Sequence, residues 1–286
     1  MKKITAFVQV YNEEGRIASL IENFSWVDEI IIFNKESTDR TKKIAIELGA
    51  TVIDMPFSEA SENFAKYINR NLENTGCCIF PTPSSLIHPE LAYDILDQIK
   101  NPLFEYEAIA LPYLMYVLNI SSKYSPWGGE YKIICIKKSA LILTDILHNE
   151  IGFDTKKILK INNSLSKKNY ALFHCTHKSV DDFFTNHMRY TRYEANYYRN
   201  NNKVIKLFPL FKEFLISICT VLIRRKTYML GWDGVALALG YISYFQMKFI
   251  YAWEQKKLDK NPYKIQFSEM SKLWKMHKKK NDTRIL

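Results

Sequence analysis

Short apolar runs alternate with amphipathic segments along the chain, and the two patterns have different periods. Continuous or alternating apolar runs predict strands, whereas apolar positions at helical spacing predict helices. The predicted strands are residues 4–11, 29–33, 51–55, 77–80, 106–118 and 131–137. The predicted helices are residues 16–26, 37–48, 58–74 and 89–100. Strands that alternate with helices imply crossover connections, so this order predicts an α/β fold whose mainly parallel sheet is flanked by helices.

Polar residues follow three of these predicted strands. They occupy Tyr11–Glu13, Asn34–Glu36 and Pro81–Ser84. In open α/β sheets, ligands bind in the crevice outside the carboxyl ends of the strands. We therefore expect these three segments to form one binding crevice.

The second part of the chain is helical, aromatic and basic, and we expect an α/β domain over 1–178 followed by a helical region over 179–286. Two apolar stretches, 207–223 and 230–253, are interrupted by charged residues, so neither is a clean membrane-spanning helix. Basic clusters border them at Arg224–Lys226 and Lys278–Lys280. This pattern fits helices that lie in an anionic membrane interface, but a helical subdomain that caps the sheet is the alternative, and both can hold.

The bulk composition narrows the function classes. Five cysteines, without a Cys-x-x-Cys pair, favour reduced thiols over a disulfide framework or a zinc knuckle. The first residues lack the apolar core of a secretory signal, so a cytoplasmic location is expected. A net charge of +10 favours an anionic partner such as a phosphate ester or acidic lipid. Tyrosine and arginine residues are interleaved over 189–199, a pattern that also occurs on nucleic-acid-binding surfaces. No nucleic-acid-binding module accompanies them, so we expect these side chains to pack between helices and the protein not to bind nucleic acid.

Several motifs, in order, resemble those of the family 2 glycosyltransferases. They are Val8–Glu14, Asp28–Ile32, Ser37–Thr41 and Gly49–Ala50. Later segments are similar to the branch that includes lipopolysaccharide core glucosyltransferases. They are His148–Glu150, His174, Arg189–Ala195 and Trp232–Gly234, and the resemblance spans about residues 4–255.

The resemblance implies a GT-A type, Rossmann-like fold that binds a nucleotide-sugar donor, a UDP-sugar or similar. The implied donor-binding residues are Val10, Tyr11, Asn12, Glu13, Asn34, Ser37, Asp39, Arg70, Thr82, Ser84 and His174. Asn12 and Glu13 can hydrogen-bond base and ribose edges. Ser37–Asp39 can present backbone N–H groups to a ligand, although these residues are also an ordinary helix cap. His174 can donate a hydrogen bond to phosphate, or be a satisfied buried histidine; with His177 alone it lacks the ligands of a zinc site.

Three positions depart from the family pattern. Thr82–Ser84 stands where Asp-x-Asp is usual, Asn34 where an Asp is usual, and Ile134 where an Arg is common. Paired carboxylates there hold Mg²⁺ or Mn²⁺, which neutralises the diphosphate, so any such ion would be held weakly here. In one interpretation the enzyme is metal-independent and cations replace the ion; the candidates are Lys35, Arg40, Lys66, Arg70 and Lys132. In the other, the chain is a degenerate transferase that binds a sugar nucleotide, glycan or partner without turnover.

An inverting transfer needs a general base close to the anomeric carbon, and a carboxylate can take the acceptor proton there. Glu150 is the first candidate and Glu130 the second, although Glu150 can equally be a capping or pairing residue of a surface turn. Trp127 and His148 are expected on the acceptor side, and the loop 125–130 is either a lid or a simple connection. The sequence thus predicts a membrane-peripheral, cytoplasmic hexosyltransferase of cell envelope biosynthesis that acts on a lipid-linked or surface glycan.

Overall fold

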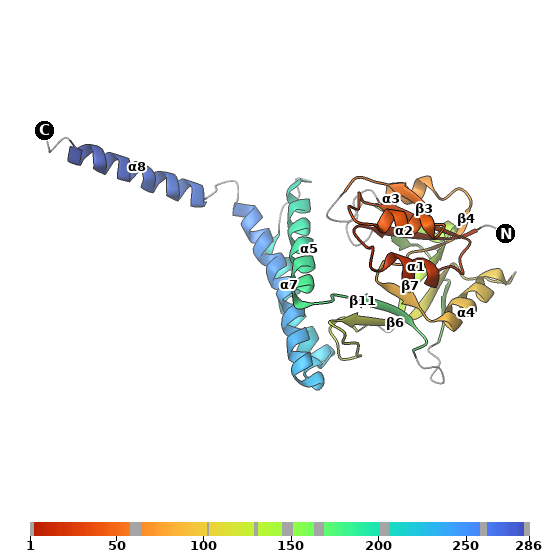
Figure 1. Cartoon of the computed structure of the whole chain (residues 1–286). Helices are drawn as coiled ribbons and strands as arrows, with labels where there is room; N and C mark the ends of the chain where they lie inside the picture. Colours follow the sequence, from red (N-terminus) through yellow and green to blue (C-terminus); the bar gives the residue numbers. More distant parts are fainter. Residues whose placement is uncertain are drawn as a thin grey trace.

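A computed structural model describes residues 3–57, 64–101, 103–128, 131–144, 151–162, 169–200, 206–257 and 262–282. The N-terminal part is a curled sheet with helices on both faces (Figure 1). Its larger strands are β1 (Lys3–Val10), β2 (Glu29–Asn34), β3 (Thr51–Asp54), β4 (Thr75–Ile79), β6 (Ala108–Val117), β7 (Tyr131–Lys137) and β11 (Leu172–Thr176). Its helices are α1 (Ile17–Asn23), α2 (Thr41–Glu47), α3 (Phe64–Arg70) and α4 (Pro89–Lys100).

The strand order is β3-β2-β1-β4-β7-β6-β11-β5, where β5 is Ser85–Ile87. β1 pairs in parallel with β2 and β4, and β2 pairs in parallel with β3. β7 runs antiparallel to both of its neighbours, whereas β11 is parallel to β6. The predicted α/β class, with a mainly parallel sheet flanked by helices and a helical C-terminal extension, is therefore confirmed.

Side chains alternate between two apolar layers along the central strand. Ile4 and Val8 of β1 pack with the helix residues Leu20 of α1 and Leu91 of α4. Phe7, between them, joins the cluster of Phe33 and α3 on the opposite face. Such two-sided burial explains why the parallel strands are continuous apolar runs. The core thus fixes which way the polar strand ends point.

Three short strands lie outside the main strand order, and two of them form a separate small sheet. They are β8 (Leu141–Leu143), β9 (Ile151–Phe153) and β10 (Ile158–Lys160). β8 and β9 pair with each other, and β10 runs parallel to β6. None of these three, nor β5, was predicted, because three residues are too few to show a period. The predicted helix over 58–74 is represented by α3, and residues 58–63 lie outside the described part.

The C-terminal part is helical, as predicted. It consists of α5 (Val180–Asn200), α6 (Leu207–Cys219), α7 (Gly231–Lys257) and α8 (Pro262–Asp282). α5 and α7 lie side by side against one edge of the α/β part, while α8 extends away from both (Figure 1). Val117, Phe183 and Leu237 form the small core between the sheet and these helices. Among the described helices, none combines the length and apolar content needed to cross a bilayer.

Candidate functional site

A cavity of about 930 Å³ opens at the carboxyl edge of the sheet, between the strand ends and α5. Its walls come from the ends of β1, β4 and β11, from the start of β7 and from one face of α5. This is the edge at which parallel α/β sheets bind ligands. Of the implied donor and acceptor residues, the cavity is lined by Val10, Tyr11, Asn12, Glu13, Thr82, Ser84, His174 and Trp127.

The end of β1 is fastened to the end of β2 through Asn12. Asn12 has a left-handed backbone conformation, with φ of 53°, which asparagine tolerates better than most residues. Its N–H donates to Ser37 Oγ at 3.0 Å, and its Oδ1 accepts from the Thr38 N–H at 2.8 Å. The Thr38 N–H at this helix start therefore has an internal partner. Ser37 lies outside the cavity lining.

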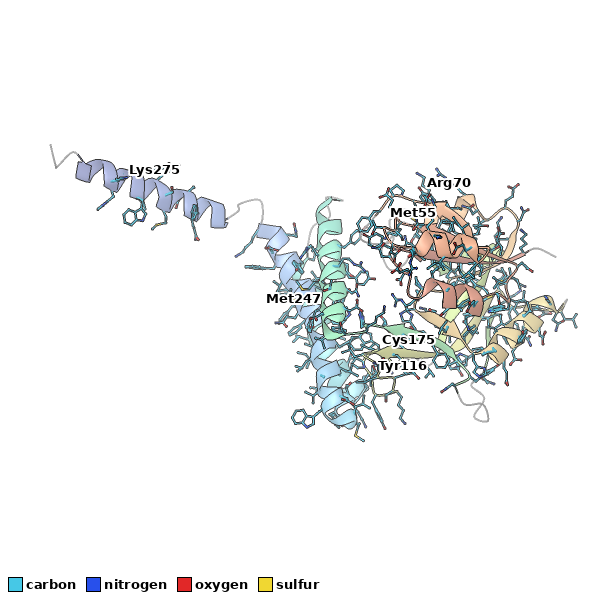
Figure 2. All side chains as sticks on the ribbon, viewed as in Figure 1. Met55, Arg70, Tyr116, Cys175, Met247 and Lys275 are labelled. Atoms are coloured by element: carbon cyan, nitrogen blue, oxygen red, sulfur yellow. The ribbon has the colours of Figure 1, made fainter. Side chains whose placement is uncertain are left out.

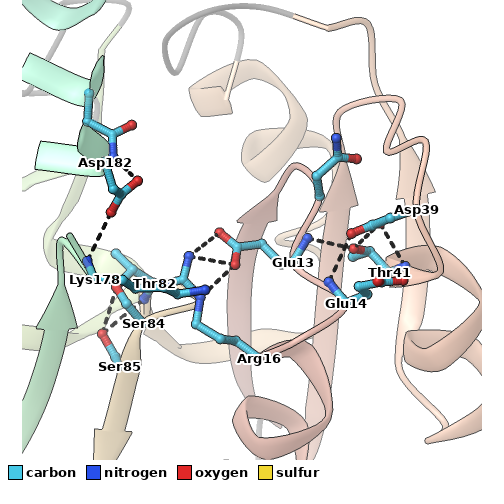
Figure 3. Close-up of polar contacts among 12 residues, drawn as sticks. Glu13, Glu14, Arg16, Asp39, Thr41, Thr82, Ser84, Ser85, Lys178 and Asp182 are labelled. Carbon is cyan, nitrogen blue, oxygen red and sulfur yellow. Dashed lines mark hydrogen bonds and ion pairs between the residues drawn. The ribbon is translucent and has the colours of Figure 1, made fainter. Parts of the chain in front are cut away.

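Asp39 ties the start of α2 to the loop after β1. Its carboxylate accepts from the N–H groups of Thr41 at 2.9 Å and Glu14 at 3.1 Å (Figure 3). These hydrogen bonds outweigh the opposing effect of burial and lower the pKa of Asp39. The Glu13 N–H also donates to Thr41 Oγ1, at 2.7 Å. Asp39 thus holds the start of α2 from the residue before its N-cap, Arg40, and it does not line the cavity.

Asn34 and Arg70 also lie apart from the cavity lining. Asn34 is buried, its Nδ2 donates to Asp54 Oδ1 at 2.8 Å, and its Oδ1 accepts from the Ser37 N–H at 3.2 Å. The amide therefore joins the ends of β2 and β3. Arg70 is exposed at the end of α3, with its guanidinium over the Tyr67 ring (Figure 2). Asn34 thus contacts Ser37, another implied donor residue, but neither Asn34 nor Arg70 joins the implied donor residues that line the cavity.

A cluster of hydroxyl groups and one imidazole forms the floor of the cavity. Thr82 Oγ1 lies 3.1 Å from Ser84 Oγ and 2.8 Å from Ser85 Oγ. His174, from β11, approaches two members of this cluster, with Nδ1 3.3 Å from Thr82 Oγ1 and Nε2 3.4 Å from Ser84 Oγ. Burial, together with nearby Lys132, lowers the pKa of His174 to about 4. The ring is therefore neutral at pH 7 and can donate one hydrogen bond and accept another.

Cations surround this floor. Arg16 makes a two-bond ion pair with Glu13, with Nε to Oε2 at 2.8 Å and Nη2 to Oε1 at 2.9 Å (Figure 3). Burial raises the pKa of Glu13, against the opposing effect of Arg16. Lys132 lies over the Tyr113 ring, and burial lowers its pKa. Lys178 follows β11 and lines the same cavity. Cations and hydroxyl donors in a half-enclosed site can bind an anionic ligand through charge-assisted hydrogen bonds.

The cations that were predicted to replace a metal ion at the diphosphate divide into two groups. Lys35 and Lys132 line the cavity, whereas Arg40, Lys66 and Arg70 do not. Arg16, Lys178 and Arg189 were missed by sequence reasoning, although Arg16 follows Glu13 by three residues and Lys178 follows the His174 strand directly.

The lining residues do not form a good site for a divalent metal. Thr82 and Ser84 offer neutral hydroxyls, and Arg16 and Lys132 lie close enough to influence His174 electrostatically. Mg²⁺ and Mn²⁺ favour carboxylate oxygen and are repelled by such cations. Within the described ranges, no group of three His, Cys, Asp or Glu side chains is placed to hold a metal ion.

The loop that contains Trp127 is packed in its described part. The Trp127 ring meets Phe183 edge to face at 5.7 Å and Tyr241 at 5.3 Å between centroids. A Cβ on Gly128 would lie 2.7 Å from the Ser122 carbonyl oxygen, so this turn closes tightly on itself. Trp127 thus packs the described part of the loop against α5 and α7, and the choice between a lid and a simple connection stays a prediction. The candidates Glu130, His148 and Glu150 lie outside the described residues.

One face of α5 completes the cavity. Asp182, Asn186, Arg189 and Tyr190 line it. The predicted packing role of this segment holds for Glu194, which accepts from Tyr244 Oη at 2.8 Å and pairs with Lys248 at 3.0 Å. Tyr190, also expected to pack, is half-buried and contributes its ring to the cavity wall.

The fold and cavity define an α/β protein with a cation-lined site at the carboxyl edge of its sheet. Proteins named as uncharacterized glycosyltransferases are similar to it. That of Rickettsia felis is 24% identical over 247 residues, which cover 82% of this chain and 83% of the relative. That of Rickettsia prowazekii is 24% identical over 250 residues, which cover 82% and 81%. No family model matches the chain.

Solved structures with similar folds include glucosyl-3-phosphoglycerate synthase from Mycobacterium tuberculosis. Its complex with Mn²⁺, UDP and glucosyl-3-phosphoglycerate is 18% identical, with a TM-score of 0.39 over 58% of this chain and 74% of that chain. Its phosphoglyceric acid complex is also 18% identical, with a TM-score of 0.35 over 48% of this chain and 57% of that chain. TM-scores at this level are too low to carry that enzyme's ligands over to this chain.

Proposed function

We propose that this chain is a GT-A type glycosyltransferase that moves a hexose from a nucleotide-sugar donor, a UDP-sugar, to a glycan or glycolipid. Two Rickettsia proteins that match it over four fifths of its length carry the name glycosyltransferase. The observation that supports the proposal most is the position of Arg16, Lys132 and Lys178. These cations line the cavity together with Thr82 and Ser84, which stand where the family resemblance places metal-binding acids.

In this proposal the cations bind the donor diphosphate in place of a metal ion. Arg16 supplies a planar fork of donors, partly engaged by Glu13, and Lys132 supplies a charge held in a half-buried position. The hydroxyls of Thr82 and Ser84 and the neutral ring of His174 add hydrogen bonds without charge. Fixed positive groups at the leaving oxygen stabilise the charge that develops there in the transition state.

The reaction is a single displacement with inversion at the anomeric carbon. The acceptor oxygen forms a bond to that carbon while the bond to the diphosphate oxygen breaks, and its electron pair stays on the departing nucleoside diphosphate. The acceptor proton passes to a carboxylate, for which Glu150 is the first candidate and Glu130 the second. Both roles stay predictions.

We place the enzyme at the inner face of the plasma membrane, in cell envelope biosynthesis, with a lipid-linked or lipopolysaccharide-type acceptor. Apolar side chains on the C-terminal helices face solvent, among them Ile223 (71% exposed) and Trp232 (87% exposed). The basic run Arg224–Lys226 lies between them in the chain. Exposed apolar and cationic groups in one segment favour an anionic lipid surface.

Helix α8 supports the same placement. Phe267 and Trp274 are 68% and 70% exposed, although they lie on a helix that extends away from the rest of the molecule (Figure 1). An isolated helix gains little stability in water without an apolar surface to pack against. A membrane interface would provide that surface.

The alternative is a degenerate GT-A protein that binds without turnover, which the loss of paired acids at Thr82–Ser84 favours. To separate the two, labelled UDP-glucose, UDP-galactose and UDP-N-acetylglucosamine are incubated with the protein and bacterial membranes, with EDTA or with Mn²⁺. The proposal predicts UDP release and sugar transfer that persist in EDTA. Thermal stabilisation by UDP without any sugar release would identify the degenerate binder. No effect of UDP on stability would contradict both.

A further inference from the structure

The end of the cavity beside α5 carries a cation of its own. Asp182, Asn186 and Arg189 recur at helical spacing on the face of α5 that lines the cavity. Asn186 Nδ2 donates to Asp182 Oδ1 at 2.9 Å, and Asp182 Oδ2 accepts from the Lys178 N–H at 3.1 Å. At the helical rise, the Cα of Arg189 lies about 10 Å further along the axis than that of Asp182. Arg189 thus lies about two helical turns along α5 from Asp182, which accepts from the N–H of Lys178, one of the cations that we assign to the donor diphosphate.

Arg189 has no acidic partner among the side chains that the structure describes. Its guanidinium lies over the Tyr190 ring, 5.0 Å from the centroid, and its buried Nε makes no hydrogen bond within the described part. An arginine keeps its charge at any physiological pH and has five donors to satisfy. A buried donor without a partner is destabilising, so an oxyanion that engages this guanidinium would be favoured.

Two histidines that line the same cavity, His177 and His187, also have free donors or acceptors. The rings of His177 and His187 are 5.0 Å apart, and the buried Nδ1 of each lacks a hydrogen-bond partner in the described structure. His177 has a φ of 58°, a left-handed conformation that is uncommon outside glycine. Burial lowers the pKa of both rings, to about 4 for His187, so they contribute hydrogen bonds but no charge at pH 7.

Aromatic rings line the same end of the cavity. Trp127, Tyr190 and Tyr244 contribute to its wall, and Trp127 is held by ring contacts to α5 and α7. Binding sites for small organic ligands combine such apolar surfaces with a few placed polar groups. A polar ring with one anionic substituent matches this combination better than an anion alone.

We propose that this end of the cavity is an acceptor subsite for a sugar that carries a phosphate or carboxylate group, with Arg189 as the residue that binds the oxyanion. The acceptor role rests on the proposed transferase function, whereas the anion preference rests on Arg189, His177 and His187 alone. The donor uses Arg16, Lys132 and Lys178, so both anionic ligands are bound at once.

The test measures the binding of glucose, glucose 6-phosphate, glucuronate and inorganic phosphate to the UDP-saturated full-length protein by calorimetry. Glucose 6-phosphate or glucuronate should bind at least about tenfold more tightly than glucose, which corresponds to one charge-assisted hydrogen-bonded contact. Comparison of the two shows whether phosphate or carboxylate is preferred. Arg189→Gln should abolish the preference for the anionic sugars over glucose and leave UDP affinity unchanged.

Two variants control for folding and for general charge. Arg192→Gln removes an arginine of the same helix that faces α7, where its Nη2 lies 3.4 Å from Tyr251 Oη, and should keep the preference. Arg189→Lys keeps the charge without the planar fork and should restore part of it. Both are compared with wild type by thermal unfolding.

Three outcomes would overturn the inference. They are equal binding of glucose and its anionic derivatives, loss of UDP affinity in Arg189→Gln, and binding of inorganic phosphate as tight as that of glucose 6-phosphate. The second result would move Arg189 to the donor site. If UDP does not bind at all but the Arg189-dependent sugar preference persists, the transferase proposal fails and the anion subsite stands.

Discussion

Acid should destabilise this protein through His174, and replacement of that residue should remove the effect. The folded protein holds the pKa of His174 at about 4, mainly because the ring is buried beside Thr82 and Ser84. In the unfolded chain the same ring titrates near its ordinary pKa of about 6.5. The folded state therefore binds fewer protons, and stability is lost as the pH falls from about 6.5 towards 4.

The size of the effect follows from the two pKa values. At pH 5 the unfolded chain has its imidazole almost fully protonated, whereas the folded protein keeps most of it neutral. The resulting loss of unfolding free energy is about 2 kcal/mol at pH 5 and approaches about 3 kcal/mol below pH 4. At pH 7.5 His174 contributes no such penalty.

Urea unfolding of wild type, His174→Gln and His277→Gln at pH 7.5 and pH 5.0, followed by circular dichroism, measures this loss. Glutamine keeps hydrogen-bonding capacity without a titration, so His174→Gln should lose about 2 kcal/mol less than wild type between the two pH values. His277, exposed on α8, provides the matched control and should behave as wild type. Equal losses in wild type and His174→Gln would refute the buried, neutral histidine.

Three further substitutions test the packing around the site. Asn34→Ala should lower the free energy of unfolding by about 2 kcal/mol, because Asp54 and the Ser37 N–H lose a buried partner; an unchanged urea midpoint would contradict this structural role. Gly234→Ala should lower the free energy of unfolding by at least about 2 kcal/mol, because the new Cβ would lie 1.9 Å from the Thr227 carbonyl oxygen. Gly15→Ala is the control: a Cβ there meets no atom within 4 Å, so this variant should unfold thermally as wild type does. Lys248→Met should lower the free energy of unfolding by about 3 kcal/mol, because Glu194 and Glu213, each 3.0 Å from its Nζ, lose the cation that they share. Lys43→Met removes an exposed ion pair with Glu47 and is the comparison; a smaller loss of unfolding free energy for Lys248→Met than for Lys43→Met would contradict the prediction.

The sequence predicted β1, β2, β3, β4, β6 and β7 because the signals of these strands are local. β1 and β2 are continuous apolar runs followed directly by polar residues, and parallel strands bring such ends to one edge. For this reason the local pattern was enough to predict that Tyr11–Glu13 and Pro81–Ser84 share a common crevice, whereas of the third predicted segment, Asn34–Glu36, only Lys35 lines it. Their roles toward a donor stay predictions.

Other parts of the site depend on contacts that no local pattern reports. Asn34 resembles a ligand-facing residue in sequence, but its amide finds Asp54 across a strand pair formed only in the folded sheet. Ile134 is in the core because the β6–β7 register shifts beside it, so Lys132 and Ile133 line the cavity. The sequence places Arg189 on a helix, but whether its side chain faces the cavity depends on how α5 packs against the sheet.

The central claim is that fixed cations hold the donor diphosphate without a metal ion. Calorimetric titration of UDP in EDTA into wild type, Lys132→Gln and Lys160→Gln tests it most directly, since Lys160 also lies over a tyrosine ring but outside the cavity. The claim predicts binding to wild type and Lys160→Gln, and an affinity for Lys132→Gln lower by about tenfold or more. Equal affinities in all three proteins, or binding that appears only when Mn²⁺ is added, would contradict it.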